Sequence, residues 1–275
     1  MTVNEMNEKR KEKGYSYAQL SKLSGVPVGT IQKVLGGITK APRYGTLIKL
    51  ARALEPELYE REYNYERTEE AFSVEENTLY NFDRSGHYTI DDYYETPEGA
   101  RVELIDGTFY NLGAPLTKHQ YIIGELFVQF KDFIRKNGGG CVPFLSPVDV
   151  RLDSDDRTML QPDMVIICDA DKQIKKKYLD GAPDLVIEIF SPSTEKRDKG
   201  YKAEKYNKAG VREYWMIDDV KKRVIVTIFD EEIIPEDDTY ISVYTFDDKV
   251  PVSIWGRACE IDFSGIKEFL GRYDV

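Results

Sequence analysis

Two acidic residues lie where a charged side chain is costly. Asp163 follows Pro162 at the start of the apolar run MVIIC, and Glu188 interrupts the apolar run DLVIEIF. An ionised carboxylate inside a covered strand is unfavourable unless a cation pairs with it. Oxygen ligands from two neighbouring strands suit Mg²⁺ or Mn²⁺, which can polarise a phosphate and activate a water molecule. Asp163 and Glu188 are therefore candidate metal ligands for phosphodiester hydrolysis.

A lysine on the next helix could complete this chemistry. The segment EKRDKGYKAEKYNKAG reads as a helix and offers Lys202 and Lys205. We expect Lys202 to be catalytic, because Asp198 and Tyr206 lie four residues before and after it on one helical face. Asp198 would fix the position of Lys202, and Tyr206 would anchor the helix. The alternative is a solvated Lys202 that pairs only with Asp198.

Apolar periodicity predicts the elements that position these residues. ARVELIDGTFYNL indicates a hairpin that turns at Asp106-Gly107, and residues 117–136 carry an apolar stripe at helical spacing. Strand patterns follow in VPFLSPVDVRLD, MVIIC and DLVIEIF, then in EYWMID after the lysine-bearing helix, and again in VIVTIFD and TYISVYTF. The expected fold is an αβββαβ core of the α+β or α/β class with extra C-terminal strands. Asp149 and Asp153 alternate with apolar residues, so we expect them on a solvent face.

The same residues carry a family resemblance. QPDMVIICD, with PDLVIEIFSPSTEKRDKGYKAEKYNKAGVREYWMID, resembles the Uma-two family of restriction endonucleases, a branch of the PD-(D/E)XK superfamily. The resemblance extends over about residues 86–260. It implies a restriction-endonuclease-like fold, with Asp163 in the PD element and Glu188 as the acidic residue of the (D/E)XK element. One position departs from the superfamily pattern, because Phe190 stands where that pattern has a lysine.

The resemblance also assigns three further positions. It places the displaced lysine at Lys202, and it implies Glu103 as a third metal ligand and His119 as an active-site neighbour. Two alternatives stay open, because Glu103 stands beside the predicted hairpin turn and His119 stands near a helix start, where an exposed polar role is common.

The first 54 residues have a different character. They hold ten Lys/Arg against three Asp/Glu, a net charge of +7 in a chain whose total is -11. Amphipathic segments broken at Gly14, Gly25 and Gly36, with Ser16 as an expected N-cap, indicate a small all-α helix-turn-helix domain.

These first 54 residues are called the head below. The head resembles the helix-turn-helix of Cro and the phage repressors through YAQLSKLSGVPVGTIQKVLGGITKAPRYGTLIKLARAL. The resemblance places residues 28–33 at the groove-facing start of the recognition helix. The implied DNA-binding residues are Val28, Gly29, Thr30, Gln32 and Lys33, with Arg43 and Tyr44 at the phosphate backbone. The alternative is a helical bundle used for dimerisation.

Composition limits the remaining possibilities. We expect a helix-turn-helix domain at 1–56, an acidic linker at 57–85 and a nuclease-like domain at 86–275. Neither a membrane segment nor a secretory signal is evident, so a cytoplasmic location is expected. Cys141, Cys168 and Cys259 are odd in number and widely spaced, which predicts reduced thiols. The chain has no Gly-rich phosphate loop or GxSxG motif, and two histidines are too few for a zinc hydrolase site.

These observations predict a metal-dependent DNA endonuclease, a hydrolase that uses Mg²⁺ or Mn²⁺ and is targeted to DNA by its head. A homodimer is plausible, since double-strand cleavage needs two active sites. The first alternative is a transcriptional regulator with a catalytically silent nuclease fold. The second is an accessory protein of a toxin-antitoxin system or mobile element, whose head contacts protein.

Overall fold

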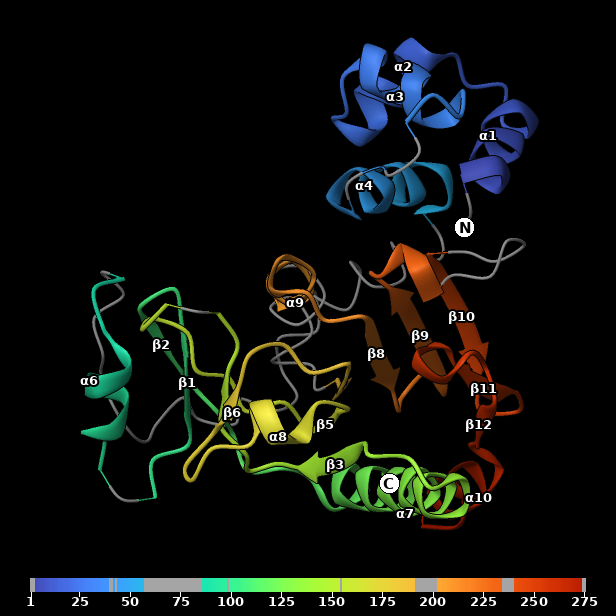
Figure 1. The fold of residues 1–275 in the computed structure, drawn as a ribbon. Coiled ribbons are helices and arrows are strands. Elements are labelled where there is room, and N and C mark those ends of the chain that lie inside the picture. Colours follow the sequence, from blue (N-terminus) through green and yellow to red (C-terminus); the bar gives the residue numbers. More distant parts are fainter. Residues whose placement is uncertain are drawn as a thin grey trace. The chain divides into compact units, whose positions relative to one another are not determined.

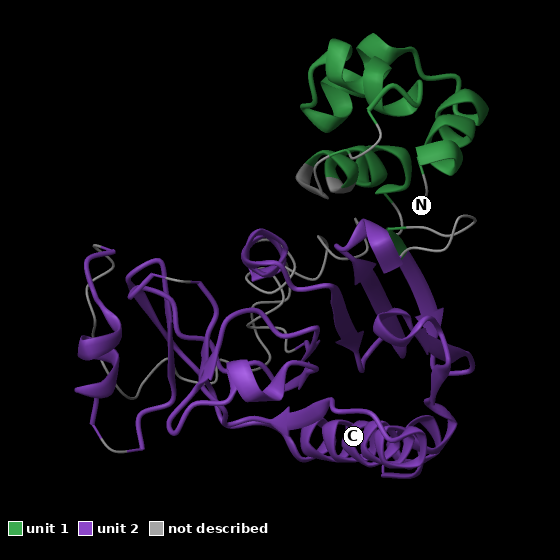
Figure 2. Cartoon of the chain, viewed as in Figure 1, with its two compact units in different colours: residues 1–78, 234–241 green, residues 79–233, 242–275 purple. Residues whose placement is uncertain are grey.

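The computed structural model describes residues 3–39, 42, 44–56, 86–97, 99–153, 155–190, 202–233 and 240–273. The chain divides into two compact units, residues 1–78 with 234–241 and residues 79–233 with 242–275 (Figure 2). Our predictions for Arg43, Asp198 and the linker 57–85 lie outside the described residues, as does the prediction for the Tyr44 side chain. None of the described helices combines the length and apolarity needed to cross a bilayer.

The described residues between 3 and 56 of the first unit form helices and their connections (Figure 1). These helices are α1 (Val3–Glu12), α2 (Tyr17–Ser24), α3 (Val28–Leu35) and α4 (Tyr44–Leu54). They enclose a core that includes the fully buried Met6, Leu20, Ile31 and Leu50. An apolar stripe at helical spacing therefore packs this unit, as its sequence predicts.

Local capping sets the turn between α2 and α3. The side chain of Ser16 accepts a hydrogen bond from the Gln19 backbone at 3.2 Å, and the Gln19 side chain accepts one from the Ser16 backbone at 2.8 Å. Gly25 ends α2 in the left-handed region, with φ of 68°. The expected N-cap at Ser16 and the break at Gly25 are confirmed.

The second unit is built on a mixed six-stranded sheet with strand order β10-β9-β8-β7-β5-β3. These strands are β3 (Val142–Leu145), β5 (Met164–Ile167), β7 (Leu185–Ile189), β8 (Glu213–Asp218), β9 (Arg223–Ile228) and β10 (Ile241–Thr245). The β7–β8 pair is parallel, and the β3–β5, β5–β7 and β8–β9 pairs are antiparallel. The helix α7 (Thr117–Asn137) precedes the sheet, and α9 (Ala203–Ala209) connects β7 to β8. The predicted αβββαβ order, with additional C-terminal strands, is confirmed.

Shorter elements complete the second unit. A hairpin of β1 (Val102–Ile105) and β2 (Thr108–Asn111) turns at Asp106-Gly107, where φ is 49° and 76°, as predicted. The other short elements are α6 (Ile90–Tyr94), α8 (Ala170–Gln173), β6 (Leu179–Asp180), β11 (Lys249–Val252), β12 (Cys259–Asp262) and α10 (Ser264–Tyr273). Helix α7 packs along β3 and beside α10 (Figure 1).

One predicted strand is split. The segment VPFLSPVDVRLD forms β3 and then a separate strand β4 (Val150–Arg151), which pairs in parallel with β6. Pro147 lies between the two strands and has no N–H to donate to a ladder. The alternation of apolar and polar residues predicted one continuous strand, but the strand ends at Leu145 and a second strand begins at Val150.

The prediction of three reduced thiols is wrong for two of them. Cys141 and Cys168 form a disulfide, and Cys259 is a buried free thiol. The antiparallel register pairs Val142 with Ile167, so the two cysteines stand opposite each other one step beyond the β3–β5 ladder. Their separation of 27 residues gave no sequence motif, because only the pairing of the strands brings them together.

Candidate active site

The two predicted acidic residues stand on neighbouring strands. β5 pairs with β7 so that Met164 lies opposite Ile187, and the next step of this ladder brings Asp163 opposite Glu188. Residues opposite each other on antiparallel strands point to the same face. The backbone N–H of Ile189 donates to Asp163 Oδ2 at 2.7 Å. This bond ties the Asp163 carboxylate to the strand that carries Glu188.

Glu188 belongs to a buried cluster with Glu103, Lys202 and Tyr206. Glu103 and Tyr206 are fully buried, whereas Glu188 is 4% and Lys202 2% exposed. Lys202 Nζ lies 2.9 Å from Glu103 Oε1 and 2.9 Å from Glu188 Oε1. The Tyr206 hydroxyl donates to Glu188 Oε1 at 2.8 Å. Burial and the neighbouring Glu188 carboxylate hold the pKa of Tyr206 well above its usual value, so its hydroxyl remains a donor.

Lys202 reaches this cluster from a helix start. It stands at the N-cap position of α9, with helical φ of -63° and ψ of -44°. Phe190 stands two residues after Glu188 and is 7% exposed, so the strand itself supplies no ammonium group there. The alternative of a solvated Lys202 is excluded by its burial between two carboxylates.

His119 lies beside the second carboxylate. It comes from the first turn of α7, and its Nε2 is 3.0 Å from Asp163 Oδ2. The side chains of His119 and Asp163 are 16% and 18% exposed, so this edge of the site is more open than the Glu103–Lys202 cluster. The structure thus brings together Glu103, His119, Asp163, Glu188, Lys202 and Tyr206 in two adjoining groups.

A supporting network behind Glu103 was missed in the sequence. The Gln161 backbone N–H donates to Glu103 Oε1 at 3.0 Å, and its side chain donates to Tyr93 Oη at 2.9 Å and to Asp149 Oδ1 at 3.0 Å. The Tyr93 hydroxyl donates to Asp149 Oδ1 at 2.8 Å. Asp149 Oδ1 therefore accepts hydrogen bonds from Gln161 and Tyr93, and Asp149 is not the solvent-facing residue that we expected. In the sequence, only its position two residues before Asp163 could have indicated a role for Gln161.

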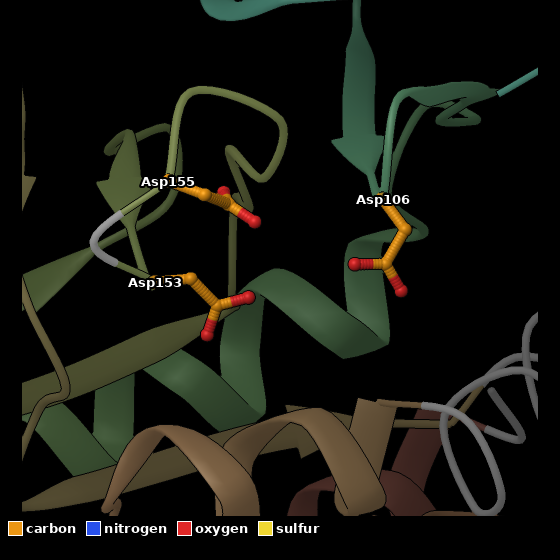
Figure 3. A group of neighbouring side chains, drawn as sticks. All are labelled: Asp106, Asp153 and Asp155. Carbon is orange, nitrogen blue, oxygen red and sulfur yellow. The ribbon is translucent and has the colours of Figure 1, made fainter. Parts of the chain in front are cut away.

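A second acidic group lies between the β1–β2 turn and the segment that follows β4. Oxygen atoms of Asp106, Asp153 and Asp155 all lie within 4.8 Å of one another, and Figure 3 shows Asp106 facing Asp153 and Asp155 across a small space. Lys205 Nζ lies 2.7 Å from Asp106 Oδ1 and also contacts Asp153 Oδ2. We expected Asp153 to face solvent. This expectation is wrong, because Asp153 forms an ion pair with Lys205 from α9. Two of these three carboxylates already have an ammonium partner.

The donor set of the predicted ligands suits a hard divalent cation. Asp163, Glu188 and Glu103 supply carboxylate oxygens, and Lys202 is the one ammonium group among these four side chains. Three carboxylates against one ammonium leave an excess of negative charge at a mostly buried position. A divalent cation with oxygen preference would offset that charge.

In the first unit, the predicted DNA-binding residues form one exposed face of α3. Val28, Gly29, Gln32 and Lys33 are exposed, while Ile31, Val34 and Leu35 are buried on the opposite side. Thr30 and Lys33 also line a hollow that continues to Lys49 on α4. The side chains that could reach a nucleic acid are thus separated from those that pack the core.

Comparisons with known proteins agree with this architecture. The family model described as "Putative restriction endonuclease" matches residues 90–249, and one described as "Helix-turn-helix" matches residues 6–57. No curated protein matches the chain. A crystal structure described as a putative nuclease from Anabaena variabilis, of the domain family of unknown function numbered 820, is 22% identical. It matches 66% of this chain and 98% of its own length with a TM-score of 0.51, which shows a shared fold.

Proposed function

Because the chain belongs to this restriction-endonuclease family, we propose that it is a metal-dependent DNA endonuclease targeted by a helix-turn-helix head. The observation that carries the proposal is the pairing of Asp163 and Glu188 on adjacent strands beside the buried ammonium of Lys202. Acidic residues with an adjoining cation are what phosphoryl-transfer chemistry requires, since negative charge increases on the phosphate oxygens during attack.

Asp163 and Glu188 would hold Mg²⁺ or Mn²⁺, with Glu103 as a further oxygen ligand. When bound, the ion supplies a Lewis acid for the scissile phosphate and lowers the pKa of a coordinated water molecule. The bond from Ile189 N–H and the contact with His119 Nε2 restrain Asp163. The protein thus presents oxygen donors whose orientation is set before substrate arrives.

Lys202 would stabilise charge on the phosphorane or orient the attacking water. Its ammonium is held between Glu103 and Glu188, so its position is restrained from two sides. Tyr206 donates to Glu188 and keeps the face of α9 that bears Lys202 against the sheet. His119, whose Nε2 lies beside Asp163 Oδ2, would orient that carboxylate.

The head would bring this site to its substrate. We propose that Val28, Gly29, Thr30, Gln32 and Lys33 contact the DNA groove, with Arg43 and Tyr44 near the phosphate backbone. We further propose domain limits of 1–56 and 86–275 with 57–85 as the linker, and a homodimer that acts on both strands in the cytoplasm.

The test is cleavage of supercoiled plasmid by the purified protein with Mg²⁺, Mn²⁺ or EDTA. Glu188→Gln and Lys202→Met should each lower the nicking rate at least about a hundredfold, because each removes a charge from the reacting centre. Glu260→Gln, on the exposed side of β12, is the matched control and should retain the wild-type rate. Nicking that survives in both active-site variants would contradict the proposal.

The second candidate is a DNA-binding regulator with a silent nuclease fold. Two observations favour it: Phe190 occupies the usual lysine position, and Glu188 Oε1 already accepts from Lys202 and Tyr206. This candidate predicts salt-dependent DNA binding by the whole protein without nicking in any metal. Rapid wild-type nicking that requires Glu188 would exclude it.

A further inference from the structure

Lys205 makes contacts that the proposed reaction does not use. Its Nζ lies 2.7 Å from Asp106 Oδ1 and contacts Asp153 Oδ2. The Lys205 side chain is 12% exposed, which is low for a lysine on a short surface helix. Although burial lowers its pKa, the hydrogen bonds to Asp106 and Asp153 outweigh burial and raise it above 10.5. Lys205 is therefore a charged group held by two carboxylates from other elements.

Asp106 belongs to a part of the fold that several backbone hydrogen bonds support. Asp106 stands in the turn of the β1–β2 hairpin, and the Gly107 backbone N–H donates to the Arg157 carbonyl at 2.8 Å. Leu104 and Met159 exchange backbone hydrogen bonds of 2.9 and 2.8 Å. The strand β1 also carries Glu103, one of the two carboxylates that hold Lys202. Lys205 thus connects α9 to the same strand and loop that present part of the active site.

Helix α9 depends on such contacts. It is seven residues long, and an isolated helix of that length is not stable in water. Its inward groups are Lys202, Lys205 and Tyr206, at the spacing of three and four residues that places side chains on one face. Lys202 and Tyr206 contact Glu188, and Lys205 contacts Asp106 and Asp153. The distance of α9 from the sheet and its rotation about its own axis determine where the Lys202 ammonium lies.

We propose that Lys205 is a positioning residue, which uses Asp106 and Asp153 to hold α9 so that Lys202 reaches Glu103 and Glu188 together. The role in catalysis rests on the proposed nuclease function, but the positioning of Lys202 does not. A displacement of about 1 Å in a catalytic group can lower a rate about a hundredfold. Loss of the ion pairs at residue 205 would therefore act on the reaction through Lys202.

The first test needs neither metal nor DNA. Amine acetylation of the intact protein, followed by mass spectrometry, reports how accessible each lysine is. Wild-type Lys202 should be protected because it is 2% exposed. In Lys205→Ala the labelling rate of Lys202 should increase at least about fivefold, while Lys205→Arg should keep Lys202 protected. Unchanged protection in a folded Lys205→Ala protein would overturn the proposal.

The second test separates positioning from direct DNA contact. In Lys205→Ala, kcat for plasmid nicking should fall about tenfold to a hundredfold with KM nearly unchanged, and Lys205→Arg should recover to within about threefold of the wild type. A raised KM with unchanged kcat would mean that Lys205 binds DNA itself, and would overturn the proposal. If the wild type does not nick DNA, the nuclease proposal fails while the labelling result still decides the positioning of Lys202.

A substitution of the partner Asp153 provides a control in case Lys205→Ala does not fold. Asp153→Asn keeps the size of the side chain and removes its charge, so it should increase the labelling of Lys202 in a folded protein, although less than Lys205→Ala because Asp106 still holds Lys205. The double variant should show no more labelling of Lys202 than Lys205→Ala alone, because Lys205→Ala already removes the contact with Asp153. Additive labelling in the double variant would overturn the proposal.

Discussion

At the scale of single residues, the buried ammonium of Lys202 should make a large contribution to stability. It is held by Glu103 and Glu188, which are 0% and 4% exposed. Removing one partner from a buried ion pair leaves an uncompensated charge and costs about 3–5 kcal/mol. Lys202→Met should therefore lower the free energy of unfolding by about that amount in urea titrations without metal.

The control for Lys202→Met is Lys208→Met on the same helix. Lys208 pairs with Glu204 at 2.7 Å, but their side chains are 69% and 60% exposed. An exposed pair of this kind contributes about 0.5 kcal/mol or less. Equal urea midpoints for the two variants would show that Lys202 is not held as a buried charge.

Glu213 should make the stability of the second unit depend on pH. It lies on β8 and accepts hydrogen bonds from Trp215 Nε1 at 2.7 Å and from the Ser253 and Ile254 backbone at 2.8 and 2.9 Å. Burial raises the pKa of Glu213 to about 7, although these donors lower it. Protonated Glu213 therefore stabilises the fold fully below about 4.5, and this contribution is lost as the pH rises through about 7.

The measurement is urea unfolding of the wild type and Glu213→Gln between pH 4.5 and 8. A pKa difference of about 2.5 units corresponds to at most about 3.4 kcal/mol. The wild type should lose up to that much relative to the neutral variant as the pH rises. Parallel pH profiles would mean that Glu213 does not titrate in this range.

Site residues that stand out from their immediate sequence neighbours could be predicted. Site residues whose role depends on a partner far along the chain could not. Asp163 and Glu188 break apolar runs, and that conflict is visible in the sequence. Lys205 and Asp106 are 99 residues apart, so their ion pair left no local pattern. The same reason explains why Asp153 looked like a solvent-facing residue.

At the scale of elements, the turn between α2 and α3 should depend on Gly25. Its φ of 68° lies in the left-handed region, and a Cβ there would meet nothing within 4 Å. Gly25→Ala should therefore destabilise the head by about 1 kcal/mol through backbone conformation alone. Calorimetry of the whole chain would show this as a lower unfolding temperature for the transition of the head.

Gly29 provides the control for Gly25. It stands inside α3 without a left-handed φ, and a Cβ there would also meet nothing within 4 Å. Gly29→Ala should leave stability unchanged or raise it by about 0.5–1 kcal/mol, because alanine has the higher helix propensity. A loss of stability in Gly29→Ala equal to that in Gly25→Ala would show that available space, and not φ, governs both positions.

The disulfide between Cys141 and Cys168 should stabilise the edge strand β3. It closes a loop over a separation of 27 residues, which corresponds to about 3.5 kcal/mol from the entropy of the unfolded chain. Dithiothreitol should lower the urea midpoint of the wild type and leave Cys141→Ser unchanged. Cys259 is a free thiol outside this pair, so Cys259→Ser should keep the wild-type sensitivity to reductant. A wild type insensitive to reductant would count against the pairing.

The order of elements was predictable because apolar periodicity is a local property. The strands β5 and β7 are near-continuous apolar runs, and both are fully buried along their length. The split between β3 and β4 was not predicted, because alternation continues through the Pro147 region while the hydrogen-bonding partner changes from β5 to β6. Strand partners are tertiary information, and so was the disulfide.

At the scale of the whole molecule, the distribution of charge matters more than its sum. The first 54 residues carry a net charge of +7, although the chain totals -11. A polyanion such as DNA responds to local positive potential, and each phosphate contact that a lysine makes releases counterions. An acidic protein can therefore bind DNA through its head, with an affinity that falls as salt increases.

The position of positive charge on the head, and not its amount, should set this salt dependence. Lys33 is exposed on α3, the proposed recognition helix. Lys11 is exposed on α1 and pairs with Glu8 at 3.1 Å. Lys33→Ala should reduce the slope of log affinity against log salt by about 0.9, the value for one lost phosphate contact, whereas Lys11→Ala should leave it unchanged. Titrations of the whole protein with a labelled duplex at several salt concentrations would measure both slopes. If the two variants lost the same slope, the head would attract DNA only as a diffuse positive charge, and α3 would lose its assignment as the recognition helix.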